Sequence, residues 1–86
     1  MGFIFSSRLK KEYKALSKET KKLLKKKLLL MSENQMHPSL RTKKIQGREN
    51  IFECSLNMSI RMTWEYKEEK IFLRAIGEHD STIKNP

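Results

Sequence analysis

Residues 51–76 contain three segments in which apolar and polar side chains alternate at every second position, and this pattern constrains the fold most. The three segments are residues 51–56, 60–67 and 71–76. Period-two alternation is typical of strands that bury one face. Residues 57–59 and 68–69 separate the segments and are rich in polar side chains. The sequence therefore predicts a three-stranded antiparallel meander with two short turns.

The lengths of the two turns predict the register of the meander and its two faces. The expected cross-strand pairs are Tyr66 with Ile71, Trp64 with Leu73, Met62 with Ala75, Leu56 with Ile60, Cys54 with Met62, and Phe52 with Trp64. One face then collects the large apolar side chains except Ile51, Phe72 and Ile76. The other face carries Glu53, Ser55, Arg61, Thr63, Glu65 and Arg74. A one-residue slip would exchange the two faces, so we expect the register to be well specified. The sheet then has a core face and a polar face, and we expect the functional site on the polar face.

The charge of the chain is concentrated in its N-terminal half. A length of 86 residues predicts one small domain that spans residues 1–86. The formal net charge of this chain is +9. Residues 1–47 hold 13 Lys and Arg against 3 Asp and Glu, whereas residues 48–86 hold 6 against 7. Such an imbalance favours a polyanionic partner, which leaves RNA, DNA, an acidic protein and an anionic membrane surface open.

Several classes of protein are disfavoured by what the sequence contains. Cys54 is the single cysteine, so no disulfide framework is expected and the chain is predicted to be cytoplasmic. Cys54 falls on the apolar side of the first strand of the meander, which predicts a buried, inert thiol. His37 and His79 lie far apart without a nearby ligand cluster, so we expect no metal and no other cofactor. The longest apolar run, residues 28–31, cannot cross a bilayer, and no signal peptide precedes the chain.

The N-terminal half predicts a strand followed by two helices. Residues 1–5 have the composition of a short strand, and Ser6 or Ser7 can cap a helix over residues 8–16. Ser17 can cap a second helix that runs to about residue 34, and we expect the two helices to form a hairpin. The predicted fold is therefore α+β, with the helices on one face of the meander. Gly77 is expected to end the last strand sharply, and residues 81–86 to be loosely ordered.

Nine lysines lie between Lys10 and Lys27. They are consistent with a solvated helix face, with attraction of phosphate groups, or with a membrane-surface helix. The interpretation as a membrane-surface helix is the weakest of these, because Leu23, Leu24 and Leu28 are needed to cover the sheet. The phosphate reading makes Lys22, Lys25 and Lys26 candidate RNA-binding residues.

The segment HPSLRTKKIQGR, residues 37–48, leads from the helices into the meander. Pro38 ends the helical half because proline pushes the preceding residue out of helical geometry, and residues 43–46 can form a short strand. Arg41, Lys43 and Lys44 then arrive beside the polar face, which already holds Arg61 and Arg74. The register thus predicts a cluster of cations on one side of the sheet.

The order of these motifs resembles that of the RelE/ParE superfamily, the toxins of bacterial type II toxin–antitoxin systems. The resemblance covers essentially the whole chain and is greatest to the YafQ-like branch, with HPSL after the second helix and the Gly-X-His of LRAIGEHD after the last strand. It implies an α+β fold like that of small microbial ribonucleases. It further implies an antitoxin partner and metal-independent cleavage of mRNA on the ribosome. ParE-type members instead inhibit DNA gyrase, and no motif excludes that function.

The resemblance also implies roles for individual residues. Arg61 matches the arginine that contacts the scissile phosphate, His79 matches the histidine of the YafQ-like motif that acts as general acid or base, and Lys43, with Lys44 beside it, falls where members place a basic residue in the site. Arg41 and Arg74 join this set from the register alone.

Two serines depart from the family pattern. Ser55 and Ser59 stand where YafQ-like nucleases carry further histidine and aspartate residues. This leaves His79 as the conventional acid–base group, with Glu53 as a second candidate. The sequence is therefore consistent with a slower nuclease, with one that uses lysine and arginine alone, or with a catalytically silent RNA- or ribosome-binding relative.

Overall fold

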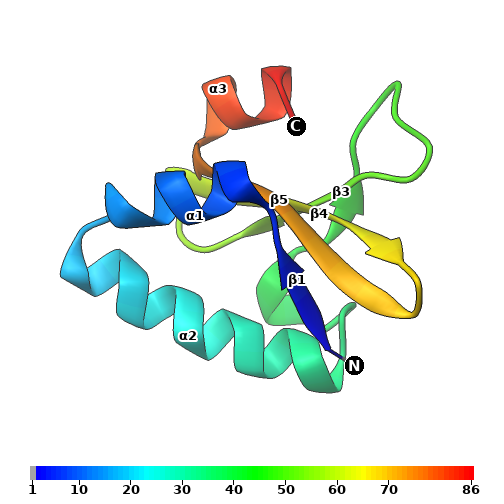
Figure 1. Cartoon of the computed structure of the whole chain (residues 1–86), viewed down its shortest axis with the longest axis horizontal. Coiled ribbons are helices and arrows are strands. Elements are labelled where there is room, and N and C mark those ends of the chain that lie inside the picture. The colour runs from blue at the N-terminus through cyan, green and yellow to red at the C-terminus, as the bar shows by residue number, and fades with distance from the viewer. Residues whose placement is uncertain (1) are drawn as a thin grey trace.

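A five-stranded sheet with helices on both faces forms the framework of the molecule (Figure 1). The computed structural model describes residues 2–86. The strands are β1 (Phe3–Phe5), β2 (Lys43–Lys44), β3 (Phe52–Ser55), β4 (Ile60–Lys67) and β5 (Lys70–Glu78), in the spatial order β1-β5-β4-β3-β2. β1 is parallel to β5, and the other neighbours are antiparallel. The predicted α+β fold and its meander are confirmed; Met1, the first residue of the predicted N-terminal strand, lies outside the described residues.

Two helices, α1 (Ser7–Lys14) and α2 (Lys18–Glu33), form the predicted hairpin on one face of the sheet (Figure 1). Ser6 caps α1, because its Oγ accepts a hydrogen bond from the Leu9 N–H at 2.9 Å. Ser17 caps α2 in the same way, accepting from the Thr20 N–H at 3.1 Å. The second cap begins a new helix three residues after α1 ends, so the chain turns back instead of continuing as one rod.

The core lies between the helix hairpin and the sheet. Its buried side chains come from both layers and include Leu9, Leu24, Met31, Leu40, Cys54, Met62, Trp64, Ile71 and Leu73. Trp64 is stacked on Phe52 with ring centroids 4.7 Å apart, and Tyr66 meets it edge-on at 5.0 Å. The expected pairs of Trp64 with Leu73 and with Phe52 are observed. The face of the meander that carries Trp64 thus points into the core, as the alternation predicts.

The predicted register fails in the second half of β5. A bulge lies between Thr63 and Trp64, where Trp64 pairs with Leu73 but Thr63 pairs with Ala75, so that Arg74 is an extra residue. Met62 therefore pairs with Ile76 and not, as expected, with Ala75. Ile76 is 1% exposed and belongs to the core, which corrects its placement on the polar face.

The C-terminal residues fold onto the polar face, contrary to the expectation of a loose tail. β5 continues through Gly77 to Glu78, and helix α3 (His79–Lys84) follows directly (Figure 1). Thr82 is buried, and the Thr63 Oγ1 donates a hydrogen bond to the Pro86 carbonyl oxygen at 2.9 Å. A Cβ atom on Gly77 would lie 3.0 Å from the Thr82 Oγ1. Gly77 therefore allows α3 to approach the sheet and does not end the strand.

Cys54 lies on β3 and is buried in the core. Burial raises the pKa of its thiol to about 12, and the positive charges of Lys27 and Arg61 offset only part of that rise. The thiolate is the reactive form of cysteine, so Cys54 is an inert core residue, as predicted. Within residues 2–86, none of the helices has the length and apolar character needed to cross a bilayer.

Candidate functional site

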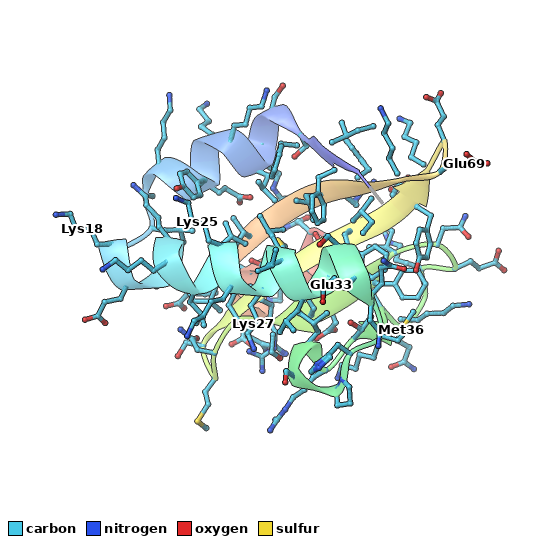
Figure 2. The ribbon with its side chains drawn as sticks, turned by 90° about the horizontal axis from the view of Figure 1, so that it is seen from below. Lys18, Lys25, Lys27, Glu33, Met36 and Glu69 are labelled. Atoms are coloured by element: carbon cyan, nitrogen blue, oxygen red, sulfur yellow. The ribbon has the colours of Figure 1, made fainter. Side chains whose placement is uncertain are left out.

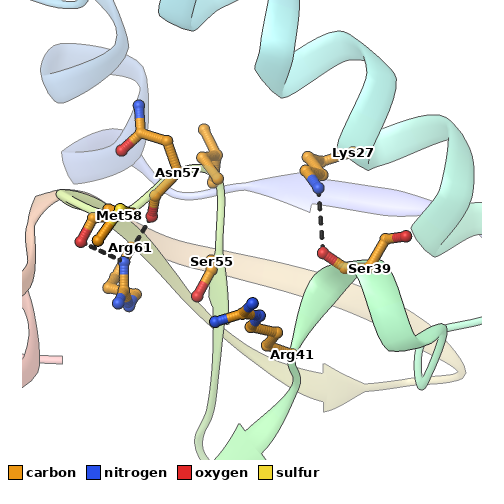
Figure 3. Close-up of a pocket in the computed structure, with 8 residues that line it drawn as sticks. Lys27, Ser39, Arg41, Ser55, Asn57, Met58 and Arg61 are labelled. Atoms are coloured by element: carbon orange, nitrogen blue, oxygen red, sulfur yellow. Dashed lines mark hydrogen bonds between the residues drawn. The ribbon is translucent and has the colours of Figure 1, made fainter.

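A pocket of about 340 Å³ opens where α2, the 3-10 helix η1 (Pro38–Leu40), β3 and the start of β4 meet (Figure 3). Three cationic residues, Lys27, Arg41 and Arg61, line it together with Ser39 and Ser55. No carboxylate of the described residues is among its lining groups. Positive charge without a neutralising partner is the property that a phosphate-binding site requires.

Arg61 is held in this pocket by backbone oxygens. Its Nη1 donates to the carbonyls of Asn57 at 2.7 Å and Met58 at 3.1 Å (Figure 3). The same nitrogen lies 3.3 Å from the Ile60 carbonyl oxygen and donates to it as well. The loop adopts this shape because the Asn57 Oδ1 accepts from the N–H groups of Ser59 and Ile60, both at 2.8 Å. Within residues 2–86, the Arg61 Nε and Nη2 have no hydrogen-bond partner. The guanidinium is thus fixed at one nitrogen and keeps further donors for a ligand.

Arg41 is positioned by the HPSL segment. The His37 Nδ1 accepts a hydrogen bond from the Ser39 N–H at 3.1 Å and thereby caps η1. Arg41 ends η1 with a left-handed backbone, φ +50°, and its side chain points toward Ser55 (Figure 3). A non-glycine residue in this conformation is uncommon and often marks a functional segment.

Lys27 completes the cationic wall and was not among the residues predicted from the sequence. Its Nζ donates to the Ser39 carbonyl at 3.0 Å, which ties α2 to η1 (Figure 3). Lys27 lies three residues after Leu24 and four before Met31, both of which are buried. Residues at this spacing share a helix face, so the spacing places Lys27 at the edge of the sheet-facing stripe and was the signal that could have found it.

Lys43 and Lys44 lie on the edge strand β2, outside the pocket. Lys43 is opposite Glu53 and Lys44 is opposite Phe52, and both lysines are exposed. Lys44 instead borders a separate depression with Tyr66. Lys43 therefore lies on the polar face, opposite Glu53, but it is not among the residues that line the cationic pocket.

Arg74 is engaged elsewhere on the polar face. Its guanidinium forms an ion pair with Glu65, and its Nε donates to the Pro86 carbonyl at 3.0 Å. These contacts follow from the bulge and from the packing of α3, neither of which the register argument included. The prediction that Arg74 joins Arg61 in one cationic cluster is corrected: Arg74 supports the C-terminal segment.

His79 does not share the pocket with Arg61. It begins α3 and borders a different depression with Asp80, Ile83 and Lys84. Its Nδ1 lies 3.1 Å from the Asp80 Oδ1. Its backbone N–H donates to the Ser59 carbonyl at 2.9 Å, so the start of α3 adjoins the loop that holds Arg61. The expectation of one hollow for both side chains is therefore wrong, and the acid–base role of His79 stays a prediction.

The three predicted α2 lysines lie away from the pocket. Lys22, Lys25 and Lys26 are exposed, whereas Lys27 is half-buried. Figure 2 shows Lys25 on the side of α2 that faces α1 and Lys27 on the opposite side. In the part of the chain that the structure describes, no group of three His, Cys, Asp or Glu side chains could hold a metal ion.

Comparison with solved structures identifies the fold. A RelB–RelE antitoxin–toxin complex from Methanococcus jannaschii aligns with a TM-score of 0.78 and 19% identity, over 96% of this chain and 99% of the other. YafQ from Escherichia coli strain BL21(DE3) aligns with a TM-score of 0.78 and 12% identity, over 93% and 94%. The intact Escherichia coli RelBE complex aligns with a TM-score of 0.73 and 24% identity, over 92% and 96%.

No protein-family model matches the sequence, and no curated protein matches it. Similarity at these identities extends to the fold, and the chain has the fold of the RelE-type and YafQ-type toxins.

Proposed function

We propose that this chain, which has the fold of the RelE and YafQ toxins, is the toxin component of a type II toxin–antitoxin system and cuts mRNA on the ribosome. The observation that carries the proposal is the pocket lined by Lys27, Arg41 and Arg61 without a carboxylate. It lies on a framework whose solved relatives include complexes of RelE with RelB antitoxins. The proposed partners are accordingly a cognate antitoxin, mRNA and the ribosome.

The proposed reaction is cleavage through the 2′-hydroxyl of the RNA itself. The 2′-oxygen forms a bond to phosphorus and loses its proton, while the bond from phosphorus to the 5′-oxygen breaks and that oxygen gains a proton. Arg61 and Arg41 would hold the phosphate oxygens as negative charge develops, because a planar guanidinium meets two such oxygens and stays charged. Preorganised donors of this kind are effective because the protein does not have to reorient them during the reaction.

Proton exchange is assigned in the proposal to His79. An imidazole can serve as general acid or general base, and the backbone hydrogen bond from His79 to Ser59 keeps this side chain next to the Arg61 loop. Lys27 adds positive charge from the opposite wall of the pocket. Lys43, on the neighbouring strand, is proposed to contact the RNA on its way to the pocket.

A catalytically silent RNA- or ribosome-binding protein is the second candidate. The observation that favours it is the position of His79 outside the pocket, together with Ser55 in place of an acid–base side chain within it. Such a protein would bind through the same cations but leave the mRNA intact.

Primer extension on mRNA translated in a purified system tests the proposed function. With the chain present, we expect new 5′ ends within the translated region, and none when ribosomes are omitted. Intact mRNA on ribosomes that bind the chain would identify the silent alternative. If the purified chain inhibits DNA supercoiling by gyrase and leaves translated mRNA intact, it is a gyrase inhibitor, and the proposal is contradicted.

A further inference from the structure

The loop between β3 and β4, residues 57–59, contacts both residues to which the proposed reaction assigns the central chemistry. The Asn57 and Met58 carbonyl oxygens accept hydrogen bonds from the Arg61 Nη1 at 2.7 and 3.1 Å (Figure 3). The next carbonyl oxygen, that of Ser59, accepts from the His79 N–H at 2.9 Å. Three consecutive carbonyls of one loop therefore hold Arg61 in the cationic pocket and the start of α3 beside it.

The side chain of Asn57 gives this loop its shape. Its Oδ1 accepts hydrogen bonds from the Ser59 and Ile60 N–H groups, both at 2.8 Å. Because both partners are donors, the amide oxygen and not the amide nitrogen must face them. A turn closed in this way by an asparagine side chain fixes the backbone of the residues that follow, and here it directs the three carbonyls.

Burial contributes little to the conformation of the loop. The side chains of Asn57, Met58 and Ser59 are exposed, and that of Met58 is 93% exposed. The base of the loop is closed by the Leu56 N–H, which donates to the Ile60 carbonyl at 3.0 Å. Above this base, hydrogen bonds rather than packing hold the tip, and two of them end on the Asn57 Oδ1.

We propose that Asn57 is a positioning residue, whose side chain fixes Arg61 and His79 relative to each other through the carbonyls of residues 57–59. The inference rests on the proposed function for the roles of Arg61 and His79. A reacting constellation has to be held to within about 0.5 Å, and a misplacement of about 1 Å can cost roughly 100-fold in rate. Without the Asn57 amide, Arg61 keeps its charge but loses the fixed position that makes it effective toward a developing oxyanion.

Single-turnover cleavage of ribosome-bound mRNA separates positioning from binding. Asn57→Ala should lower the maximal rate about 10- to 100-fold. The concentration of chain that gives half of that rate should change less than about threefold, because Lys27, Arg41 and Arg61 all keep their charge. Asn57→Ser should cleave at least about threefold faster than Asn57→Ala, since a serine hydroxyl closes the same kind of turn more weakly. A rise in the half-saturating concentration that accounts for the whole loss, or no recovery in Asn57→Ser, would overturn the inference.

Asn34→Ala is the matched control. The Asn34 Oδ1 accepts a hydrogen bond from the Met36 N–H at 3.0 Å at the C-terminal end of α2, so it closes a similar turn outside the cationic pocket. Its removal should leave the maximal rate within about twofold of that of the unaltered chain. Circular dichroism at the assay temperature should show both alanine variants folded. Equal losses of rate in the two variants would mean that loosening any turn lowers activity, and would overturn the inference.

Nuclear magnetic resonance of the ¹⁵N-labelled chain tests the positioning without cleavage. In Asn57→Ala, the heteronuclear Overhauser effect at the Arg61 Nε should fall and the His79 amide resonance should shift, because both residues lose a fixed carbonyl partner. Asn34→Ala should leave both signals unchanged. If the unaltered chain leaves mRNA intact, the proposed function fails, and these two signals still decide whether Asn57 positions Arg61 and His79. Signals that stay the same in Asn57→Ala would overturn the inference even for a chain that cuts mRNA.

Discussion

Replacing Arg61 by alanine is expected to lower the rate of mRNA cleavage by roughly 100- to 1,000-fold, the usual cost of removing one preorganised donor from a developing oxyanion. The fold should persist, because Arg61 is only half-buried and its contacts are with the carbonyls of one loop. Single-turnover primer extension on ribosome-bound mRNA measures the effect. Arg61→Lys should retain part of the activity, since a lysine keeps the charge but not the two-pronged contact with phosphate.

Arg48→Ala is the matched control for this variant. Arg48 is an exposed arginine in the segment between β2 and β3, outside the cationic pocket, so its removal changes the net charge equally. It should leave the cleavage rate within a few-fold of that of the unaltered chain. Equal losses in Arg61→Ala and Arg48→Ala would mean that total charge, and not the pocket, determines activity.

Replacing Trp64 by alanine is expected to have the largest effect on stability. Trp64 is fully buried at the centre of β4 and packs against Phe52 and Tyr66. Truncation of a buried aromatic residue typically costs about 3–5 kcal/mol, partly through the cavity that remains. A domain of this size is stable by only about 5–15 kcal/mol, so the variant should unfold at a much lower urea concentration or fail to fold.

Leu29→Ala provides the comparison for the Trp64 variant. Leu29 is 68% exposed on α2, and its truncation should change the free energy of unfolding by less than about 0.5 kcal/mol. Urea unfolding followed by circular dichroism measures both variants. A loss of under about 1 kcal/mol in Trp64→Ala would contradict the inward orientation of this face of the meander.

The meander was predictable because burial on one face imposes a period of two on the sequence. The alternation fixed the phase of Trp64 and its pairs correctly as far as the bulge. It could not locate the bulge, because the extra residue, Arg74, is polar and its neighbours on both sides, Leu73 and Ala75, fit an alternating pattern. The same counting therefore misplaced Ile76 by one position.

The C-terminal helix was missed for a different reason. The six residues of α3 carry a single large apolar side chain, Ile83, so no helical periodicity is visible. Tertiary contacts hold α3 on the sheet. They are the close approach of Thr82 to Gly77 and the hydrogen bonds from Thr63 and Arg74 to the Pro86 carbonyl. Interactions of this kind depend on the finished sheet and leave little trace in the local sequence.

The candidate site was predicted in part. Arg61 and Arg41 both line the pocket. Their proximity was predictable because the phase of β4 and the position of the HPSL segment were both interpreted correctly. Arg74 and His79 were expected beside them, but the bulge and the helical C-terminus direct both elsewhere. Lys27 comes from the helix layer, and its approach to the sheet depends on how α2 packs against η1.

We propose that RNA binds the pocket formed by Lys27, Arg41 and Arg61 rather than the general cationic surface of α2. Nuclear magnetic resonance of the ¹⁵N-labelled chain, titrated with a short 2′-O-methyl RNA that cannot be cleaved, tests it directly. We expect the largest amide shifts at Arg41, Ser55 and Arg61, with smaller shifts along α2. Shifts confined to residues 18–26, with the amides of Arg41 and Arg61 unmoved, would contradict it.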